Sequence, residues 1–186
     1  MKRVLKGSYE SCRGSDVCKN LSRFRVSSCP NMSPQEEPAP PVATGVYGSL
    51  TTTPFLSFFA ITGANVDFNV VGPFSGTTPN IVDDSITVNS DGVYTISFAT
   101  AIILFSPENE DVIVEFAITI NGIFNPILLL SKQIEITSLN SEIDTLSRTA
   151  LLTLNQGDVV RVLIVNSTGE EKVSYFSAEL VVTKVA

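Results

Sequence analysis

Three cysteines offer the clearest covalent chemistry in this 186-residue sequence, and all of them lie in one short basic segment. Cys12, Cys18 and Cys29 precede Pro30, and no cysteine follows. An odd number of thiols cannot all pair within one chain, so at least one is left for an intermolecular disulfide or a free thiol. Neighbouring Lys and Arg favour thiol exchange. We therefore expect intermolecular cross-links at these positions. The alternative is a tail that contains three inert thiols.

Other kinds of site chemistry are poorly represented. The chain has no histidine, which removes Ser–His and Cys–His nucleophilic systems and the commonest metal ligand. The cysteines are six and eleven positions apart, which does not match the spacing of zinc knuckles. No glycine-rich phosphate loop opens a helix. We expect no catalytic residues, no metal and no cofactor, and hence a protein that is not an enzyme.

Carboxylates are the remaining candidates, because paired acids cleave glycosides or hold calcium. Each acidic cluster falls in or beside a predicted loop, where solvated acids are ordinary, and none has the spacing of an EF-hand. We interpret them as loop surface, and Asp158 as a turn residue. The clusters are Asp83 with Asp84, Glu108 with Glu110 and Asp111, Glu142 with Asp144, and Glu170 with Glu171.

Three regions differ in composition. Residues 1–32 form a basic, Cys-bearing N-terminal arm. Residues 33–45, "SPQEEPAPPVATG", hold four prolines and are typical of an extended linker. From residue 46 to residue 186 the chain is rich in Val, Ile, Thr and Phe, punctuated by Gly, Pro, Asn and Asp, which indicates an all-β domain.

Charge separates the arm from the domain. Residues 1–42 carry seven basic and four acidic residues, a net of +3, whereas residues 43–186 carry five and fifteen, a net of −10. An acidic domain repels nucleic-acid phosphates and attracts the arm of a neighbouring copy. This distribution favours self-association and argues against a nucleic-acid partner.

The strands of the domain follow from alternation with a period of two. In residues 92–105, Tyr94, Ile96 and Phe98 share one face. Residues 111–123 alternate likewise and end in Asn121-Gly122, a tight-turn pair. Residues 148–166 predict two strands joined across 155–158, and residues 173–186 predict the last strand, with Phe176, Ala178, Leu180 and Val182 inward. We expect a sandwich of eight to ten antiparallel strands, with the phenylalanines in the core or an interface: Phe55, Phe58, Phe59, Phe68, Phe98, Phe116 and Phe176.

Two strands are apolar on both faces, residues 101–105 and 159–165. A strand with no polar face needs a second covering layer, and we expect that layer to be another subunit. Arg161 is the one charge in the second strand, placed either to pair across the interface or to lie at its rim. The predicted subunit interface comprises Ala101, Ile103, Phe105, Val159, Arg161 and Leu163.

The start of the chain, "MKRVLKGSYE", is basic but is followed by no apolar run, so it does not resemble a secretory signal. No apolar run reaches the ~18 residues of a spanning helix. We therefore expect no membrane insertion.

Four sequence features carry a family resemblance: "DGVYTISFA" with Gly92, Tyr94 and Phe98, the Asn-Gly hairpin, "TALLTLNQGDVVRVLI", and "SYFSAELVV" near the end. Together they resemble the jelly roll of tumour necrosis factor and the complement heads. The "VVTKVA" ending is similar to the C-terminal domains of the Bacillus collagen-like exosporium glycoprotein and to the small exosporium basal-layer proteins. The resemblance covers about residues 46–186. It implies a jelly-roll homotrimer on a bacterial spore surface, made in the mother-cell cytoplasm without a signal peptide.

The arm is not part of that family pattern, and no Gly-x-y stalk precedes the domain. In "SRFRVSS", Phe24 and Val26 alternate with Arg23 and Arg25, which predicts a short strand. We expect this strand to add to a sheet edge of the next trimer, where the cysteines lock the joint. Thirteen linker residues at ~3.1 Å each reach about 40 Å.

These features predict a structural protein whose trimers join into a fibre, such as a spore appendage, or into a layer. Its expected partner is itself, and other spore-surface proteins are further candidates. The alternative is a trimeric adhesion module that displays loops such as residues 72–80 and 106–112 to a receptor or glycan.

Overall fold

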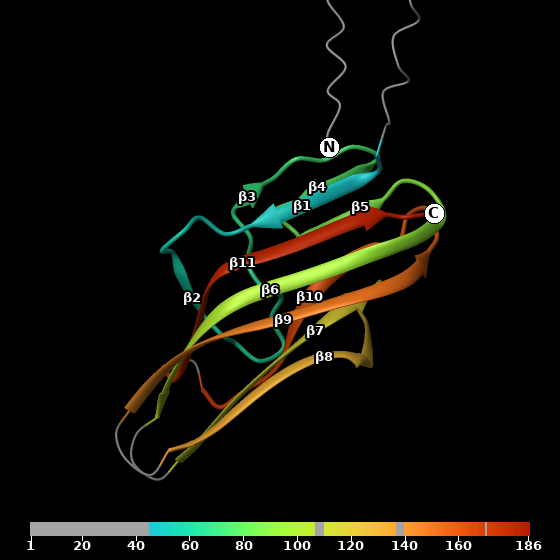
Figure 1. Cartoon of the computed structure of the whole chain (residues 1–186). Helices are drawn as coiled ribbons and strands as arrows, with labels where there is room; N and C mark the ends of the chain where they lie inside the picture. The colour runs from blue at the N-terminus through green and yellow to red at the C-terminus, as the bar shows by residue number, and fades with distance from the viewer. Residues whose placement is uncertain (1–44, 107–109, 137–139, 170) are drawn as a thin grey trace, which may run out of the picture. The chain divides into compact units, whose positions relative to one another are not determined.

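The computed structural model describes residues 45–106, 110–136, 140–169 and 171–186, and in these residues the chain forms eleven strands and no helix. The strands build two antiparallel sheets that face each other as a sandwich (Figure 1). The predicted all-β jelly-roll class is confirmed. The strand number exceeds the expected eight to ten because two very short strands flank the first sheet.

The first sheet, sheet A, has the order β3-β1-β11-β6-β9, and β2 pairs with β11 outside this path. Its members are β1 (Tyr47–Thr51), β2 (Ser57–Phe59), β3 (Val70–Val71), β6 (Gly92–Ser106), β9 (Asn140–Leu154) and β11 (Val173–Lys184).

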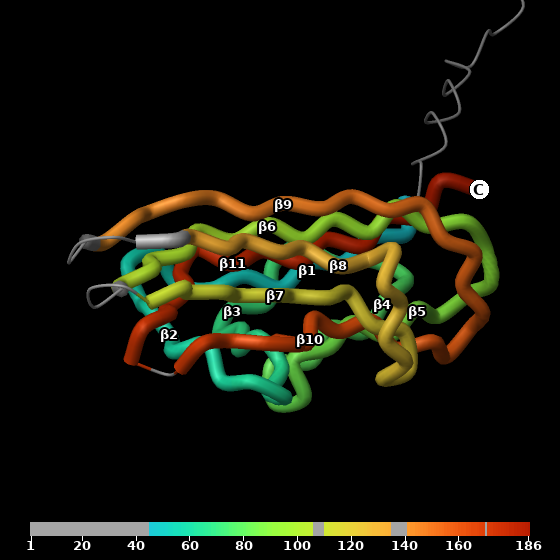
Figure 2. Tube along the Cα trace, turned by 90° about the horizontal axis from the view of Figure 1, so that it is seen from below, coloured from blue at the N-terminus to red at the C-terminus, as the bar shows by residue number. Residues whose placement is uncertain are grey.

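The second sheet, sheet B, has the order β4-β5-β10-β7-β8. Its members are β4 (Thr77–Asn80), β5 (Ser85–Val88), β7 (Glu110–Ile120), β8 (Ile123–Ile136) and β10 (Val159–Ser167). The last strands of the two sheets, β8 and β9, run along the same margin of the sandwich (Figures 1 and 2).

The core lies between the sheets and follows the predicted alternation. Tyr94, Ile96 and Phe98 are buried on β6, as the sequence predicts. Phe116 on β7 fills the centre, with ring centroids 5.8 Å from Phe98 and 6.0 Å from Tyr175. Aromatic rings in such tilted and edge-on arrangements stabilise a core beyond the area that they bury.

The prediction that Phe176 points inward is wrong, although Ala178, Leu180 and Val182 are buried as expected. The pairing of β11 with β6 shifts register between Phe176 and Glu179, where Ser177 has a φ of 50°. This bulge reverses the alternation, so Tyr175 takes the core position and Phe176 is only half-buried.

The predicted Asn-Gly turn joins β7 to β8, with positive φ values of 54° at Asn121 and 76° at Gly122. The side chain of Asn121 bonds to the neighbouring β9–β10 turn. The Asn121 amide donates to Asp158 Oδ1 at 2.8 Å, and its oxygen accepts from the Val159 N–H at 2.9 Å. Asp158 is a turn residue, as predicted.

No helix in the described residues is long and apolar enough to cross a membrane.

Candidate self-association surface

The outer face of sheet A, which points away from sheet B, is nearly free of charge. Its side chains alternate with the buried ones along each strand, so the register of the strands identifies them. One row across the sheet, for example, joins Ser49, Val181, Ser97 and Thr149. The positions in register on β1, β11, β6 and β9 are Tyr47, Ser49, Thr51, Ser174, Phe176, Glu179, Val181, Thr183, Val93, Thr95, Ser97, Ala99, Ala101, Ile103, Phe105, Ser141, Ile143, Thr145, Ser147, Thr149, Leu151 and Thr153.

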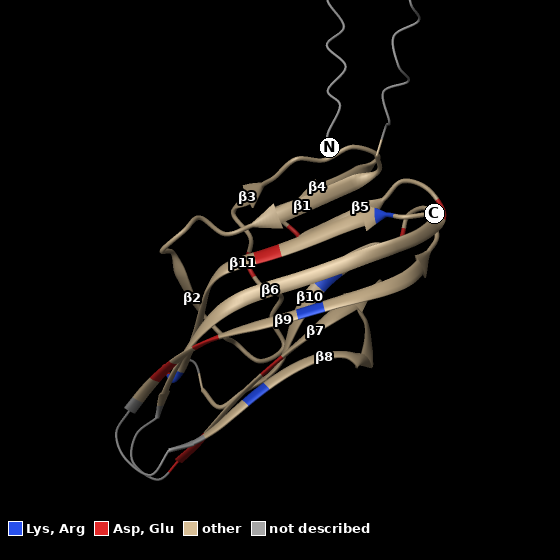
Figure 3. Cartoon of the chain, viewed as in Figure 1, with Lys and Arg blue, Asp and Glu red and all other residues tan. Residues whose placement is uncertain are grey.

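Glu179 is the single charged residue among these positions. The charged residues of β9 do not belong to this face, because they lie opposite core residues of β6. Glu142 pairs with Leu104, Asp144 with Ile102 and Arg148 with Phe98. Figure 3 shows β1 and β6 without any charged position, whereas β9 carries both signs.

Removing water from a broad face of small, hydroxyl-bearing and aliphatic side chains costs little free energy. Burying unpaired charges is what makes association costly, and here Glu179 is the single charge to accommodate. Hydroxyl groups on the face already bond to each other, since Ser97 Oγ lies 3.0 Å from Thr149 Oγ1. The composition is that of a surface suited to contact with protein.

The margin formed by β8 and β9 is the second unusual surface. Polar groups join the two strands: Lys132 Nζ on β8 lies 2.7 Å from Asp144 and 3.0 Å from Glu142 on β9. Hydrogen bonds to these two carboxylates raise the pKa of Lys132, and Lys132 in turn lowers the pKa of Asp144. The guanidinium of Arg148 donates to the backbone carbonyl of Ile127, which adds a second link across the margin.

Large aliphatic side chains project beside these links. Ile123 and Ile127 on β8 are each 71% exposed, and Ile143 and Leu151 on β9 are also exposed. Neither strand has a further pairing partner among the described residues, so both present free backbone edges. The margin therefore combines exposed aliphatic side chains with charged links and two free backbone edges, and it continues across β9 into the outer face of sheet A.

Two hollows indent these surfaces. One, of about 340 Å³, lies on the outer face over β1 and β11, lined by Tyr47, Gly48, Ser49, Pro73, Glu179, Val181 and Thr183. The other, of about 270 Å³, lies beside the β7–β8 turn, lined by Ile120, Asn121, Ile123, Asn125, Leu128, Leu152, Thr153, Leu154 and Asp158.

The six predicted interface residues lie on two different surfaces. Ala101, Ile103 and Phe105 belong to the outer face of sheet A, where Phe105 is exposed and the other two are half-buried. Val159, Arg161 and Leu163 lie half-buried on sheet B, on the opposite side of the sandwich.

Arg161 already has a contact within its own chain, because its Nε donates to the Asp83 carbonyl at 3.2 Å. The sequence analysis did not identify Ile127, Arg148 or Glu179, whose neighbours become visible only once the strand order is known.

The predicted arm residues Cys12, Cys18, Cys29, Arg23, Phe24, Arg25 and Val26, and nearly all of the linker, lie outside the described residues.

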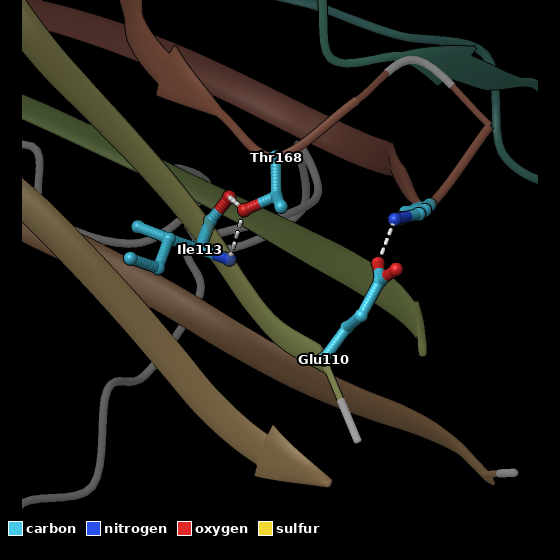
Figure 4. Close-up of polar contacts among 4 residues, drawn as sticks. Glu110, Ile113 and Thr168 are labelled. Carbon is cyan, nitrogen blue, oxygen red and sulfur yellow. Dashed lines mark hydrogen bonds and ion pairs between the residues drawn. The ribbon is translucent and has the colours of Figure 1, made fainter. Parts of the chain in front are cut away.

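Several residues of the acidic clusters engage groups of their own chain. Asp84 Oδ1 accepts from the Phe68 N–H at 2.8 Å, and burial together with Asp67 and Asp83 raises the pKa of Asp84. Glu110 pairs with Lys172 near the point where Thr168 bonds to Ile113 (Figure 4). Among the described residues, no group of three or more potential ligands is placed to hold a metal ion.

No protein-family model and no curated protein matches the sequence. Solved structures do match in fold. Eiger TNF from S. frugiperda aligns with a TM-score of 0.57 and 15% identity over 77% of this chain and 94% of its own. The globular domain of zebrafish complement 1qA aligns with a TM-score of 0.52 and 18% identity over 76% and 98%. The domain therefore has the jelly-roll fold of TNF and the complement 1q heads.

Proposed function

We propose that this chain is a non-catalytic, self-assembling structural protein whose jelly-roll domains form a homotrimer through the outer face of sheet A. The N-terminal arms then join trimers into a fibre or layer on the surface of a bacterial spore. The observation that carries the trimer is the face itself: sheet A has five strands in its main path, and its outer positions hold one charged residue.

The geometry favours a ring over a symmetric pair. A ring arises when a surface of one copy contacts a different surface of the next, provided that the rotation closes. This chain has two such surfaces, the outer face of sheet A and the β8–β9 margin, and they meet at β9. In a trimer each copy lays its margin against the face of its neighbour, which covers both surfaces and both free edges at once. The TNF and complement-head resemblance supports three as the number of copies.

A charge placed on the face tests the trimer. Ala99 lies on the outer face of β6, and a lysine there can extend into water in a monomer but is buried in the assembly. In reducing buffer, light scattering coupled to gel filtration should show a trimer for the unaltered chain and a monomer for Ala99→Lys. Thr87→Lys, a half-buried position on β5 of sheet B that β10 and β7 separate from β8, is the matched control and should remain a trimer. A monomeric unaltered chain would rule out the proposal.

The arm's role is supported by the sequence: three thiols, a Phe-Val alternation with arginines, and a linker of sufficient reach. Electron microscopy of the full-length protein should show ordered fibres or layers. A chain that begins at Val46 should show discrete trimers. Replacing Cys12, Cys18 and Cys29 by serine should leave the assemblies visible but make them dissociate in denaturant without reductant. Identical particles from the full-length and shortened chains would exclude the arm as connector.

The spore location is supported by the resemblance of the sequence to exosporium proteins. Immunogold labelling of intact spores from the bacterium that encodes the chain tests it. Label on the spore surface or its appendages is the expected result, and label confined to vegetative cells would contradict it.

An adhesion module is the second candidate, and one observation favours it. Phe55 is 97% exposed and has a φ of 70°, in the turn where the Leu56 N–H donates to the Thr53 carbonyl at 3.2 Å. A large residue in this conformation is strained by about 1–2 kcal/mol. If the protein is an adhesin, assembly stops at the trimer, and Phe55→Ala reduces binding to a glycan array or host-cell lysate without changing the trimer.

A further inference from the structure

A bulge in β8 turns Ile127 into a fixed projection. Ala117 of β7 pairs with Leu129, and Thr119 pairs with Phe124, so residues 125–128 form an excess loop opposite one residue of β7. Both backbone groups of Ile127 are held: its N–H donates to Asn125 Oδ1 at 3.0 Å, and its carbonyl accepts from the Arg148 guanidinium. The side chain is 71% exposed. An aliphatic side chain on a rigid, outward loop is suited to fill a hollow.

The hollow over β1 and β11 has the complementary character. Its volume of about 340 Å³ lies at the lower end of the range of binding pockets, ~300–1,000 Å³, and exceeds what one aliphatic side chain needs. Pro73 forms its rim and is held by Ser49, whose Oγ donates to the Pro73 carbonyl at 3.3 Å. Tyr47 and Val181 supply apolar walls, and Glu179 supplies the single charge.

Within the described part of the chain, Glu179 and Arg148 each lack a charged counterpart. Among the described residues, no Lys or Arg lies within ion-pair distance of Glu179, and no carboxylate lies within that distance of Arg148. Arg148 uses part of its guanidinium on the Ile127 carbonyl, and a guanidinium has five N–H donors in a planar fork. It can therefore keep that bond and still receive a carboxylate.

The projection and the hollow lie at the same height along the strands. Arg148 pairs with Phe98, Phe98 with Leu180, and Leu180 with Leu50. The hollow's Ser49–Val181 and Glu179 positions belong to the two rows that flank this one. Rotation about an axis parallel to the strands of sheet A carries the β8–β9 margin to a neighbouring copy without changing its height.

We infer that, in the trimer, Ile127 of each copy enters the hollow of the next, and Arg148 of that copy forms an ion pair with Glu179 of the next. The inference rests on the proposed trimer and deepens it by naming the contact that sets its register. The single charge on the outer face then has its partner, and one of the two most exposed aliphatic side chains of β8 leaves water at the same step.

Disulfide trapping tests the contact directly. In the full-length chain with Cys12, Cys18 and Cys29 replaced by serine, Ile127→Cys is combined with Val181→Cys. Mild oxidation should yield covalent dimers and trimers on a non-reducing gel, and reduction should return the single chain. The matched control combines Ile127→Cys with Thr87→Cys, a half-buried position on sheet B, and should give no such bands above the level of either single cysteine.

Light scattering on the same samples tests the trimer separately from the Ile127 contact. A trimer with Ile127–Val181 bands supports the inference. A trimer without those bands overturns the contact and leaves the trimer in place, whereas a monomer overturns both.

A charge exchange supplies an independent test. Glu179→Arg should raise the trimer dissociation constant at least tenfold, because it brings two cations together at each contact. Adding Arg148→Glu in the same chain should recover most of that loss. Equal dissociation constants for Glu179→Arg and the unaltered chain would contradict the ion pair.

Discussion

The hydroxyl of Tyr175 on β11 accepts a hydrogen bond from the backbone N–H of Asp67 at 2.9 Å and lies 3.3 Å from the Asp67 carboxylate. The two residues are 108 positions apart, so this contact ties the irregular segment before β3 to a core strand. Burial, the largest cause, raises the pKa of Tyr175, so the hydroxyl stays protonated over the whole range in which proteins are handled.

Removing that hydroxyl should loosen the segment. Tyr175→Phe leaves the Asp67 N–H without its partner but retains the stack on Phe58, whose ring centroid lies 5.6 Å away. We expect a loss of about 1–2 kcal/mol in the free energy of unfolding, measured in urea. Tyr47→Phe, which alters an exposed ring, is the control. Equal unfolding midpoints for the two variants would show that the hydroxyl contributes nothing.

The Asp84 carboxyl should make stability depend on pH in the acid range. Burial raises its pKa, with contributions from Asp67 and Asp83, although the Phe68 N–H lowers it. A raised pKa means that the folded chain holds this proton more tightly than the unfolded chain. The contribution of Asp84 to stability is therefore complete below the ordinary pKa of 3.8 and is lost as pH rises through the folded value.

Asp84→Asn should remove this dependence, since an amide keeps the acceptor for Phe68 and tolerates the φ of 49° at this position. At pH 7 we expect the variant to be more stable by less than about 1 kcal/mol, because solvent screens a group this exposed. Urea unfolding at pH 4 and pH 7 measures the difference. A variant less stable than the unaltered chain at pH 7 would refute the assignment.

Thr168 adds its side chain to a backbone contact with Ile113, whose carbonyl accepts from the Thr168 N–H at 3.0 Å. Its Oγ1 accepts from the Ile113 N–H at 2.7 Å and donates to the Ile113 carbonyl at 3.2 Å, just beyond the irregular pairing of β10 with β7 (Figure 4). Thr168→Val keeps the shape and removes both bonds, so we expect a loss of about 1 kcal/mol. Thr168→Ser keeps the hydroxyl and should lose much less. Amide hydrogen exchange at Ile113 should accelerate in the valine variant alone.

Asn121 serves both a backbone and a side-chain purpose at the β7–β8 turn. Asn121→Gly deletes the two bonds to Asp158 and Val159 but accepts the positive φ. Asn121→Ala deletes the same two bonds and, in addition, places a Cβ in this unfavourable conformation. We expect the alanine variant to be less stable than the glycine variant by about 1 kcal/mol, the cost of a left-handed conformation with a Cβ. Thermal unfolding of the three chains checks the order, and equal midpoints for glycine and alanine would contradict it.

The alternation of apolar residues predicted much of the core, because burial on one face of a strand leaves a local trace in the sequence. Tyr94, Ile96 and Phe98 show this. The same rule failed at Phe176, because the bulge at Ser177 shifts the alternation of buried and exposed positions. No glycine marks this bulge in the sequence.

Which residues share a surface could not be predicted from alternation alone. Ala101 and Leu163 both lie on strands that look apolar on two sides, yet they belong to opposite sheets. The meeting of Arg148 with Ile127 depends on which strands end each sheet. Strand order is a property of the whole chain, so no local pattern reveals it.

The free edges of β8 and β9 also bear on how the protein is produced. Among the described residues, each newly folded copy leaves one backbone edge unpaired on a strand of fifteen residues and on a strand of fourteen, and any chain with a β-edge can pair with them. Copies that encounter other copies quickly cover these edges in the trimer. Copies at low concentration keep the edges open and can pair with other proteins. Yield and solubility should therefore improve with rapid, concentrated synthesis, the reverse of what is usual for aggregation-prone proteins.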